Sequence, residues 1–236
     1  MQNTTAQYKR IIAGEHTFET KVTINGNELG GDKIISLDRT RKAFANDLPS
    51  IGGALSSSIV LKVRKPSFSI PKMAAVTVSV RAKNDSETSD WLAAGTYYID
   101  TREESEAQGN AAIMTITAYD AMLKAEADYP DTEHDWPYKD SLVVAEIAAE
   151  IGVTVDSRVS GFITAGNMIN LPSDYSMRET LEHIAGMYAG NFIITNDNKL
   201  MFIPLWGLDY TESGYYLADE NGNALTFGNE GWFIFV

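Results

Sequence analysis

The side chains best placed to carry chemistry are 32 acids and three histidines, His16, His134 and His183, in a chain without cysteine. The absence of cysteine excludes disulfides, cysteine nucleophiles and thiolate metal sites. His183 falls in the middle of an expected helix beside Glu179 and Glu182, with no serine elbow nearby, and no H-E-x-x-H or G-x-S-x-G motif occurs. The sequence therefore predicts a surface helix residue at His183, not a general base.

His134 lies in the acidic segment DTEHDWP, among Asp131, Glu133 and Asp135. Imidazole and carboxylates both bind zinc, so a metal site is chemically possible there. A single histidine in an acidic loop is weak evidence, and we predict no metal site and no cofactor. A pair of carboxylates for glycoside hydrolysis has almost no specificity as a signal, because 32 acids supply many chance pairs.

The segment DENGNALTFGNE, residues 219–230, resembles a calcium-binding loop more closely. Four oxygen-bearing side chains fall at positions 1, 3, 5 and 12 of such a loop: Asp219, Asn221, Asn223 and Glu230. However, Ala224 replaces the sharp-turn glycine of position 6, and the flanks are strand-like where helices are required. We favour a hairpin with an Asn-Gly turn, and adventitious calcium binding is the alternative.

Residues 175–204 combine a capped helix with a hairpin instead of a phosphate-binding loop. Ser176 and Glu179 form a capping box, and Gly190 is predicted to end the helix. Phosphate loops precede a helix, whereas this glycine follows one. The turn-forming residues 196–198 separate two strands. The predicted buried face of the helix comprises Leu181, Ile184, Ala185 and Tyr188.

The first half of the chain alternates like strands. In residues 18–24, Phe18, Thr20, Val22 and Ile24 share one face, and Asn25-Gly26 supplies a hairpin turn. Further strands carry Ile59, Leu61 and Val63, then Val76, Val78 and Val80, and two more flank a polar turn at 103–110. After Ile116 the pattern predicts a short helix that Pro130 ends. Several short strands separated by turns suggest a sandwich or barrel.

The acidic residues 128–140 are predicted to link two regions, and a helix follows them. Asp140 is its expected N-cap and Gly152 its left-handed C′ residue. The expected apolar face comprises Leu142, Ala145, Ile147, Ala148 and Ile151.

The charge is unevenly distributed over the 236 residues. Residues 1–130 hold 15 basic and 16 acidic residues, whereas residues 131–236 hold 4 and 16, and the total is −13. Non-specific DNA binding needs basic residues that neutralise phosphates, so the second half is expected to repel DNA. An acidic surface that aids solubility is the simplest explanation. No apolar run approaches the roughly 18 residues of a membrane helix, and no signal-peptide core is evident. An uncleaved cytosolic product is expected.

The order of four segments is distinctive: 49–65 with two glycines, 70–82, 91–105 and 114–129. Within them, residues 95–100 read GTYYID and residues 117–122 read TAYDAM. A capped helix and hairpin follow, carried by Ser176, Arg178, Glu179, Leu181, Ile184, Ala185, Gly190, Phe192, Lys199 and Leu200. Over most of residues 30–205 this order resembles tail hub proteins of long-tailed bacteriophages and prophages, also called baseplate hub or tail-associated proteins.

The resemblance implies an α+β, mainly β fold of tail-tube-like β-barrel domains with intervening helices. We expect an N-terminal β-barrel domain at residues 1–130. Residues 131–236 would form a helix-containing α+β region with C-terminal β-hairpins, as an incomplete second barrel. The resemblance also implies a homotrimer whose barrels form a pseudo-sixfold ring at the virion tail tip. The expected partners are the tail tube or distal tail protein, the tape measure protein and the tail spike or fibre.

The sequence thus predicts a structural tail protein, not an enzyme, with no catalytic, metal or cofactor residues and no membrane insertion. DNA would pass through its ring without specific binding, along a channel that a good share of the acids after residue 130 would line. Two other functions remain as alternatives. A carbohydrate-binding β-domain for host recognition would use exposed aromatics, among Trp91, Tyr97, Tyr98, Trp136, Trp206, Tyr215 and Tyr216. A tail-associated cell-wall hydrolase would need a pair of catalytic acids.

Overall fold

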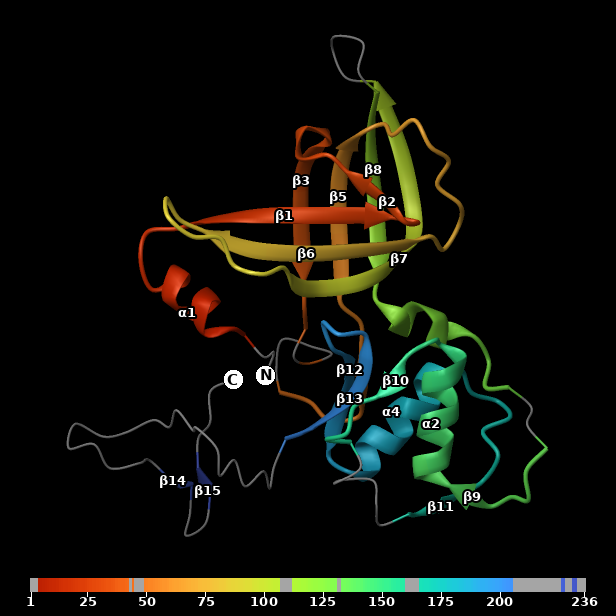
Figure 1. The fold of residues 1–236 in the computed structure, drawn as a ribbon. Helices are drawn as coiled ribbons and strands as arrows, with labels where there is room; N and C mark the ends of the chain where they lie inside the picture. Colours follow the sequence, from red (N-terminus) through yellow and green to blue (C-terminus); the bar gives the residue numbers. More distant parts are fainter. Residues whose placement is uncertain are drawn as a thin grey trace.

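The fold consists of two β-sheets and a small group of helices (Figure 1). The structure, a computed structural model, describes residues 4–42, 44, 49–106, 112–130, 133–159, 166–205, 226–227 and 231–232. A seven-stranded antiparallel sheet has the strand order β2-β1-β6-β7-β8-β5-β3, and a four-stranded sheet has the order β10-β13-β12-β4. The predicted mainly β class, with helices set beside the strands, is confirmed.

The seven-stranded sheet is built from the first half of the chain. Its strands are β1 (Thr17–Ile24), β2 (Asn27–Leu29), β3 (Ile34–Thr40), β5 (Ser58–Arg64), β6 (Ala75–Lys83), β7 (Leu92–Glu106) and β8 (Ala112–Tyr119). The short helix α1 (Ala6–Ile12) precedes them, and the 3-10 helix η1 (Gly31–Lys33) lies between β2 and β3. The predicted hairpin turn is confirmed: Asn25 and Gly26 both have positive φ between paired β1 and β2.

The sheet curls into a half-barrel because β7 bends. Register shifts leave Ala94 without a partner on β6 and Asp100 without a partner on β8. Such bulges bend a strand and increase its twist. As a result β1 and β6 run across β3, β5 and β8 (Figure 1). Strand β7 extends to Glu106, so the polar turn predicted to start at residue 103 starts later.

The concave side of the half-barrel holds one hydrophobic cluster. Ile59, Leu61 and Val63, predicted to share one face, are all buried, and so are Val76 and Val78. On β1, Val22 and Ile24 are buried, but Phe18 is 56% exposed. Phe18 lies on the same face of β1, as predicted, and is exposed because the first half of β1 extends past the cluster.

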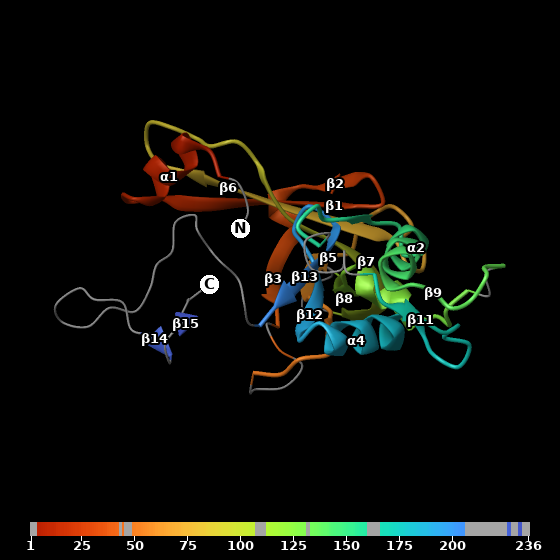
Figure 2. The same cartoon turned by 90° about the horizontal axis from the view of Figure 1, so that it is seen from below.

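The second part of the fold packs two helices onto the four-stranded sheet. Helix α4 (Met177–Met187) lies alongside β12, one of the two inner strands of this sheet (Figure 2). Helix α2 (Asp140–Glu150) lies beside α4. The sheet contains β4 (Gly53–Leu55), β10 (Thr154–Val155), β12 (Gly190–Ile194) and β13 (Lys199–Pro204). Two short pairs are separate from it: β9 (Tyr138–Lys139) with β11 (Met168–Ile169), and β14 (Thr226–Phe227) with β15 (Gly231–Trp232).

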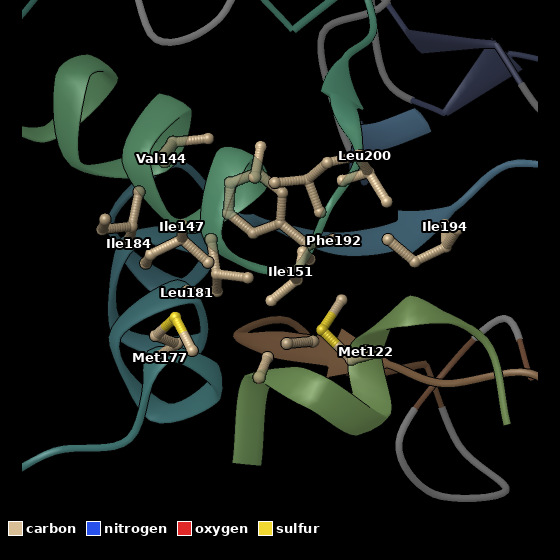
Figure 3. Packing of buried hydrophobic residues seen from close by; sticks show 14 of the residues in the cluster. Met122, Val144, Ile147, Ile151, Met177, Leu181, Ile184, Phe192, Ile194 and Leu200 are labelled. Carbon is tan, nitrogen blue, oxygen red and sulfur yellow. The ribbon is translucent and has the colours of Figure 1, made fainter. Parts of the chain in front are cut away.

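A second hydrophobic cluster joins these elements to the end of the half-barrel (Figure 3). Ile147 and Ile151 of α2 meet Leu181 and Ile184 of α4, and Phe192 fills the space above the sheet. Met122 enters the same cluster from η2 (Ala121–Glu126), a 3-10 helix that takes the place of the short helix predicted after Ile116.

The acidic segment 128–140 is packed where the structure describes it. Tyr129 is buried in the second cluster, and Trp136 and Tyr138 pack against it. The cluster also takes Ala54 and Met122 from the first half of the chain. The division into domains at residue 130 stays a prediction.

The buried face of α2 differs from the predicted one. Ile147, Ala148 and Ile151 are buried as expected, but Leu142 is 42% exposed. Val143 and Val144 are buried in place of Leu142 and Ala145. The prediction was wrong because four successive apolar residues, 142–145, cover almost every side of the helix, so periodicity did not distinguish the two faces.

The ends of α2 were predicted with mixed success. Asp140 is the first helical residue instead of the N-cap, and its carboxylate accepts the N–H of Ser141 and the hydroxyl of Tyr188. Gly152 has φ +77°, as a left-handed C′ residue should. The N–H groups of Gly152 and Val153 bond to Ala149 and Ala148, which completes a Schellman motif.

The capping box of α4 is confirmed, since Ser176 and Glu179 exchange side-chain and backbone hydrogen bonds. The expectation that Gly190 ends the helix was wrong. Ala189 takes the positive φ of +51°, and Gly190 is the first residue of β12. Glycine is needed at 190 for space: an added Cβ would lie 2.3 Å from Phe202 Cζ and 2.5 Å from the Ile203 carbonyl oxygen.

The remaining sequence predictions concern two turns and the absence of a membrane-spanning helix. The hairpin around residues 196–198 is confirmed, with Asn198 at φ +57°. The Asn221-Gly222 turn lies outside the described residues. Among the residues described, no helix has the length and apolar character needed to cross a membrane.

We predict that Gly190→Ala destabilises the protein by about 1–3 kcal/mol, because overpacking displaces Phe202 and the β13 backbone. Urea unfolding followed by circular dichroism measures the free energy. Gly14→Ala is the control, since an added Cβ at Gly14 meets nothing within 4 Å. Equal unfolding free energies for the two variants would contradict this account of Gly190.

Candidate functional site

The residues with catalytic potential lie apart from one another. His183 is exposed on α4, where its ring meets Tyr175 edge-on at 4.7 Å. His16 lies at the start of β1, near Phe18. His134 stacks on Tyr138, with ring centroids 4.3 Å apart. No described histidine therefore shares a site with another.

His134 serves to attach its segment to α2. Its Nε2 lies 2.7 Å from Glu146 Oε1, and the Tyr129 hydroxyl donates to Glu146 Oε2 at 2.6 Å. Among the described residues, no three histidine and acidic side chains gather closely enough to hold a metal ion. Asp131 lies outside them, and so do the four calcium-loop candidates Asp219, Asn221, Asn223 and Glu230.

The described aromatic residues pack against protein groups in different places. Tyr97 is buried in the half-barrel cluster. Trp91 is held between Lys21 and Arg81, at 4.8 and 4.4 Å from its ring centroid. Tyr98 lies under the Lys124 ammonium, and Trp136 packs with Tyr129 and Tyr138. These rings share no exposed groove; Trp206, Tyr215 and Tyr216 lie outside the described residues.

Two residues of the resemblance motifs, Asp120 and Arg178, instead meet at one place, the junction between the two sheets. Its centre is β4, which belongs to the first half of the chain but pairs in parallel with β12. The Asn191 side chain fixes this pairing, because Oδ1 accepts the N–H of Gly53 at 2.8 Å and Nδ2 donates to the Ser50 carbonyl at 2.8 Å. All three residues of β4 are buried.

Asp120 holds the chain that leaves β4. Its buried carboxylate accepts the Ser57 N–H at 2.7 Å, the Ser56 hydroxyl at 3.0 Å and the Met122 N–H at 3.1 Å. Asp120 therefore caps η2 and fixes the end of β4 with one carboxylate. Burial raises its pKa above the ordinary aspartate value, although the hydrogen bonds act in the opposite direction.

Arg178 holds β4 from the other side. Its Nε donates to the Ala54 carbonyl at 3.0 Å, and its guanidinium pairs with Glu126 of η2 and approaches Glu182 at 3.6 Å. Asp120 and Arg178 belong to the motifs that resemble tail hub proteins, but the sequence alone did not predict this role for them. Their charge was the one sequence feature that could have indicated this role, since each is a charged residue set among packing residues.

Two open hollows flank Arg178, and the walls of the first are mainly polar. One, of about 460 Å³, is lined by Glu126, Asp128, Asp174, Ser176, Arg178, Glu179 and Glu182. The other, of about 560 Å³, shares Glu126, Arg178 and Glu182 and reaches Thr40 and Lys42. We call the first hollow the acidic groove. No histidine is among its lining residues, and the described residues there form no group that could hold a metal ion.

Most described acids after residue 130 face solvent. Six are exposed: Glu133, Asp135, Glu150, Asp174, Glu179 and Asp197. Asp140 and Asp156 are buried, and Glu146 and Glu182 are half-buried. The acidic character predicted for this half of the chain is therefore largely a property of its surface.

The chain shares its fold with solved tail proteins. The 43 kDa tail protein of prophage MuSo2 from Shewanella oneidensis superposes with a TM-score of 0.55 at 15% identity, over 86% of this chain. A tail protein from Neisseria meningitidis MC58 superposes with a TM-score of 0.52 at 12% identity, also over 86%. This chain spans 60% and 57% of their respective lengths. No family model and no curated protein matches the sequence.

We predict that Asp120→Ala lowers the unfolding free energy by on the order of 2–4 kcal/mol, because the buried N–H groups of Ser57 and Met122 lose their acceptor. Chemical unfolding monitored by fluorescence measures the loss. Asp38→Ala removes an exposed acid of β3 and should stay within about 0.5 kcal/mol of the wild type. A similar small effect for Asp120→Ala would show that this carboxylate does not hold the junction.

Asp156, which follows β10, is predicted to titrate at a pKa of about 2, because Arg158 donates hydrogen bonds to its carboxylate. The stability it contributes is present above the ordinary value of 3.8 and is lost as pH falls through 2. Arg158→Gln should raise this pKa toward 3.8, as measured by NMR titration of the carboxyl carbon. Lys199→Gln is the control and should shift the pKa less. An unchanged pKa in Arg158→Gln would refute the assignment.

Proposed function

We propose that this protein is a structural, non-enzymatic component of a phage or prophage tail, located at the virion tail tip. It would form a homotrimeric hub ring that joins the tail tube to the distal spike or fibre and lets DNA pass. The observation that carries the proposal is the fold, which superposes on the MuSo2 tail protein over 86% of this chain.

The position of the motif residues supports an assembly role. The segments that resemble tail hub proteins meet at β4, where Asp120 and Arg178 use their charges on backbone groups and on Glu126. Charges engaged in this way hold two sheets together and do not perform a reaction. A hub ring needs subunits whose two sheets are fixed relative to each other, because each barrel sets the position of the next barrel in the ring.

The exposed acids support passage of DNA. Phosphate affinity rises with each basic contact, so a surface with six exposed carboxylates and few cations would not retain DNA. In the proposed trimer a good share of these acids line the channel. The partners would be the tail tube or distal tail protein on one side, and the tape measure protein and the spike or fibre on others.

The described aromatics do not favour the carbohydrate-binding alternative, since each packs against different protein groups. The hydrolase alternative needs a pair of catalytic acids, and in the acidic groove Glu126 pairs with Arg178 while Glu179 caps α4, so these two acids already serve the fold.

We predict that light scattering across a concentration series gives a mass near three times the monomer's 25.9 kDa. Negative-stain images of the same sample should show closed rings. The sample is then mixed with purified tail-tube protein, and a ring seated on the tube end is expected. A monomer at every concentration, both alone and with the tube protein, would contradict the hub function.

A further inference from the structure

Two arginines converge on one amide oxygen between the sheets. Arg39 Nη2 donates to Asn196 Oδ1 at 2.5 Å, and Arg41 Nη1 donates to the same atom at 3.2 Å. Asn196 belongs to the turn between β12 and β13, which these hydrogen bonds place close to the end of β3. The two guanidinium groups therefore lie within a few ångström of each other.

The strand register sets the direction of Arg39. It lies opposite Ile59 of β5, whose side chain is buried in the half-barrel cluster. Directly opposed residues place their side chains on the same face, so Arg39 points to the concave side. Thr40 alternates to the other face, where Thr40 and Lys42 line the second hollow.

The positive charge of this pair has no ion-pair partner among the described residues. Of the other described arginines, Arg10, Arg81, Arg158 and Arg178 each pair with a carboxylate, and Arg64 and Arg102 are exposed to solvent. In addition, Arg39 Nε is buried and makes no hydrogen bond. A buried guanidinium donor without an acceptor is costly, which makes this position unlike the other arginine sites.

The electrostatics of the neighbourhood agree with the geometry. Burial lowers the pKa of Arg41, and the nearby charge of Arg39 lowers it further. Asp120 acts in the opposite direction, but its carboxylate already accepts three hydrogen bonds at the junction. An added anion would relieve the repulsion between the two guanidinium groups.

We propose that Arg39 and Arg41, positioned by Asn196, form a binding site for an oxyanion, either a carboxylate or a phosphate group. Guanidinium groups bind such groups through paired N–H donors, with both charge and planar geometry matched. Because the chain carries a net charge of −13, an acidic side chain of a second copy is one source of the anion, and free phosphate is the other. The site does not rest on the proposed hub function.

The first experiment titrates inorganic phosphate by isothermal calorimetry at constant ionic strength and follows thermal unfolding in parallel. Wild type and the control Lys42→Gln should bind phosphate saturably, with a rise in Tm. Arg41→Gln should bind on the order of tenfold more weakly or not at all, as expected for loss of one charge-assisted contact. Arg41→Lys keeps the charge but lacks the planar fork, so its affinity should be intermediate. Circular dichroism confirms that each variant is folded.

The second experiment distinguishes the two sources. If a carboxylate of a second copy fills the site, light scattering in phosphate-free buffer shows self-association that phosphate reverses and that Arg41→Gln lacks. If a free anion fills it, the mass does not change with phosphate although Tm rises. Equal responses of Arg41→Gln and Lys42→Gln in both experiments would overturn the site.

Discussion

The constraint on which the rest of the fold depends is the insertion of β4 into the second sheet. A three-residue strand from the first half of the chain pairs with β12, about 140 residues later, and all three residues are buried. So short a strand supplies few ladder hydrogen bonds, and edge pairs of this length are weak by themselves. Side chains from three other elements therefore complete it: Asn191 at its start, Arg178 at Ala54 and Asp120 at its end. Because these groups belong to a strand, a helix and a helix cap, the sheets and helices are fixed by the same few contacts.

Local features were predictable from the sequence, and features that depend on this insertion were not. The Asn25-Gly26 turn, the capping box of α4 and the C′ position of Gly152 depend on neighbours within a few residues, and all three appear as predicted. The buried face of α2 depends on which sheet it meets, so Val143 and Val144 replaced Leu142 and Ala145. The prediction that Gly190 ends α4 was wrong, because the local sequence does not show which strand packs against this residue. Its requirement for space arises from Phe202 on the paired strand, which no local pattern reveals.

The same distinction between local and long-range features applies to the candidate site. The sequence marked the motif segments around Asp120 and Arg178 by their order along the chain, but not their shared target. Both residues contact residues 54–57, which lie more than sixty positions from Asp120 and more than a hundred from Arg178. The arginine pair at Arg39 and Arg41 gave no signal at all, because its partner Asn196 reads locally as a turn former.

The two links between the sheets differ in how their charges are satisfied, and this difference bears on assembly. At β4, buried Asp120 accepts three hydrogen bonds and Arg178 pairs with Glu126, so the link is complete within one chain. At the end of β3, Arg39 and Arg41 donate to the same neutral acceptor, Asn196 Oδ1, and the buried Nε of Arg39 makes no hydrogen bond. A structural protein that must first fold and then assemble benefits from such a separation. The complete link stabilises the monomer, whereas the incomplete one gains stability when an anion arrives. Because the chain carries a net charge of −13, that arrangement would let a neighbour's carboxylate bind where two guanidinium groups meet.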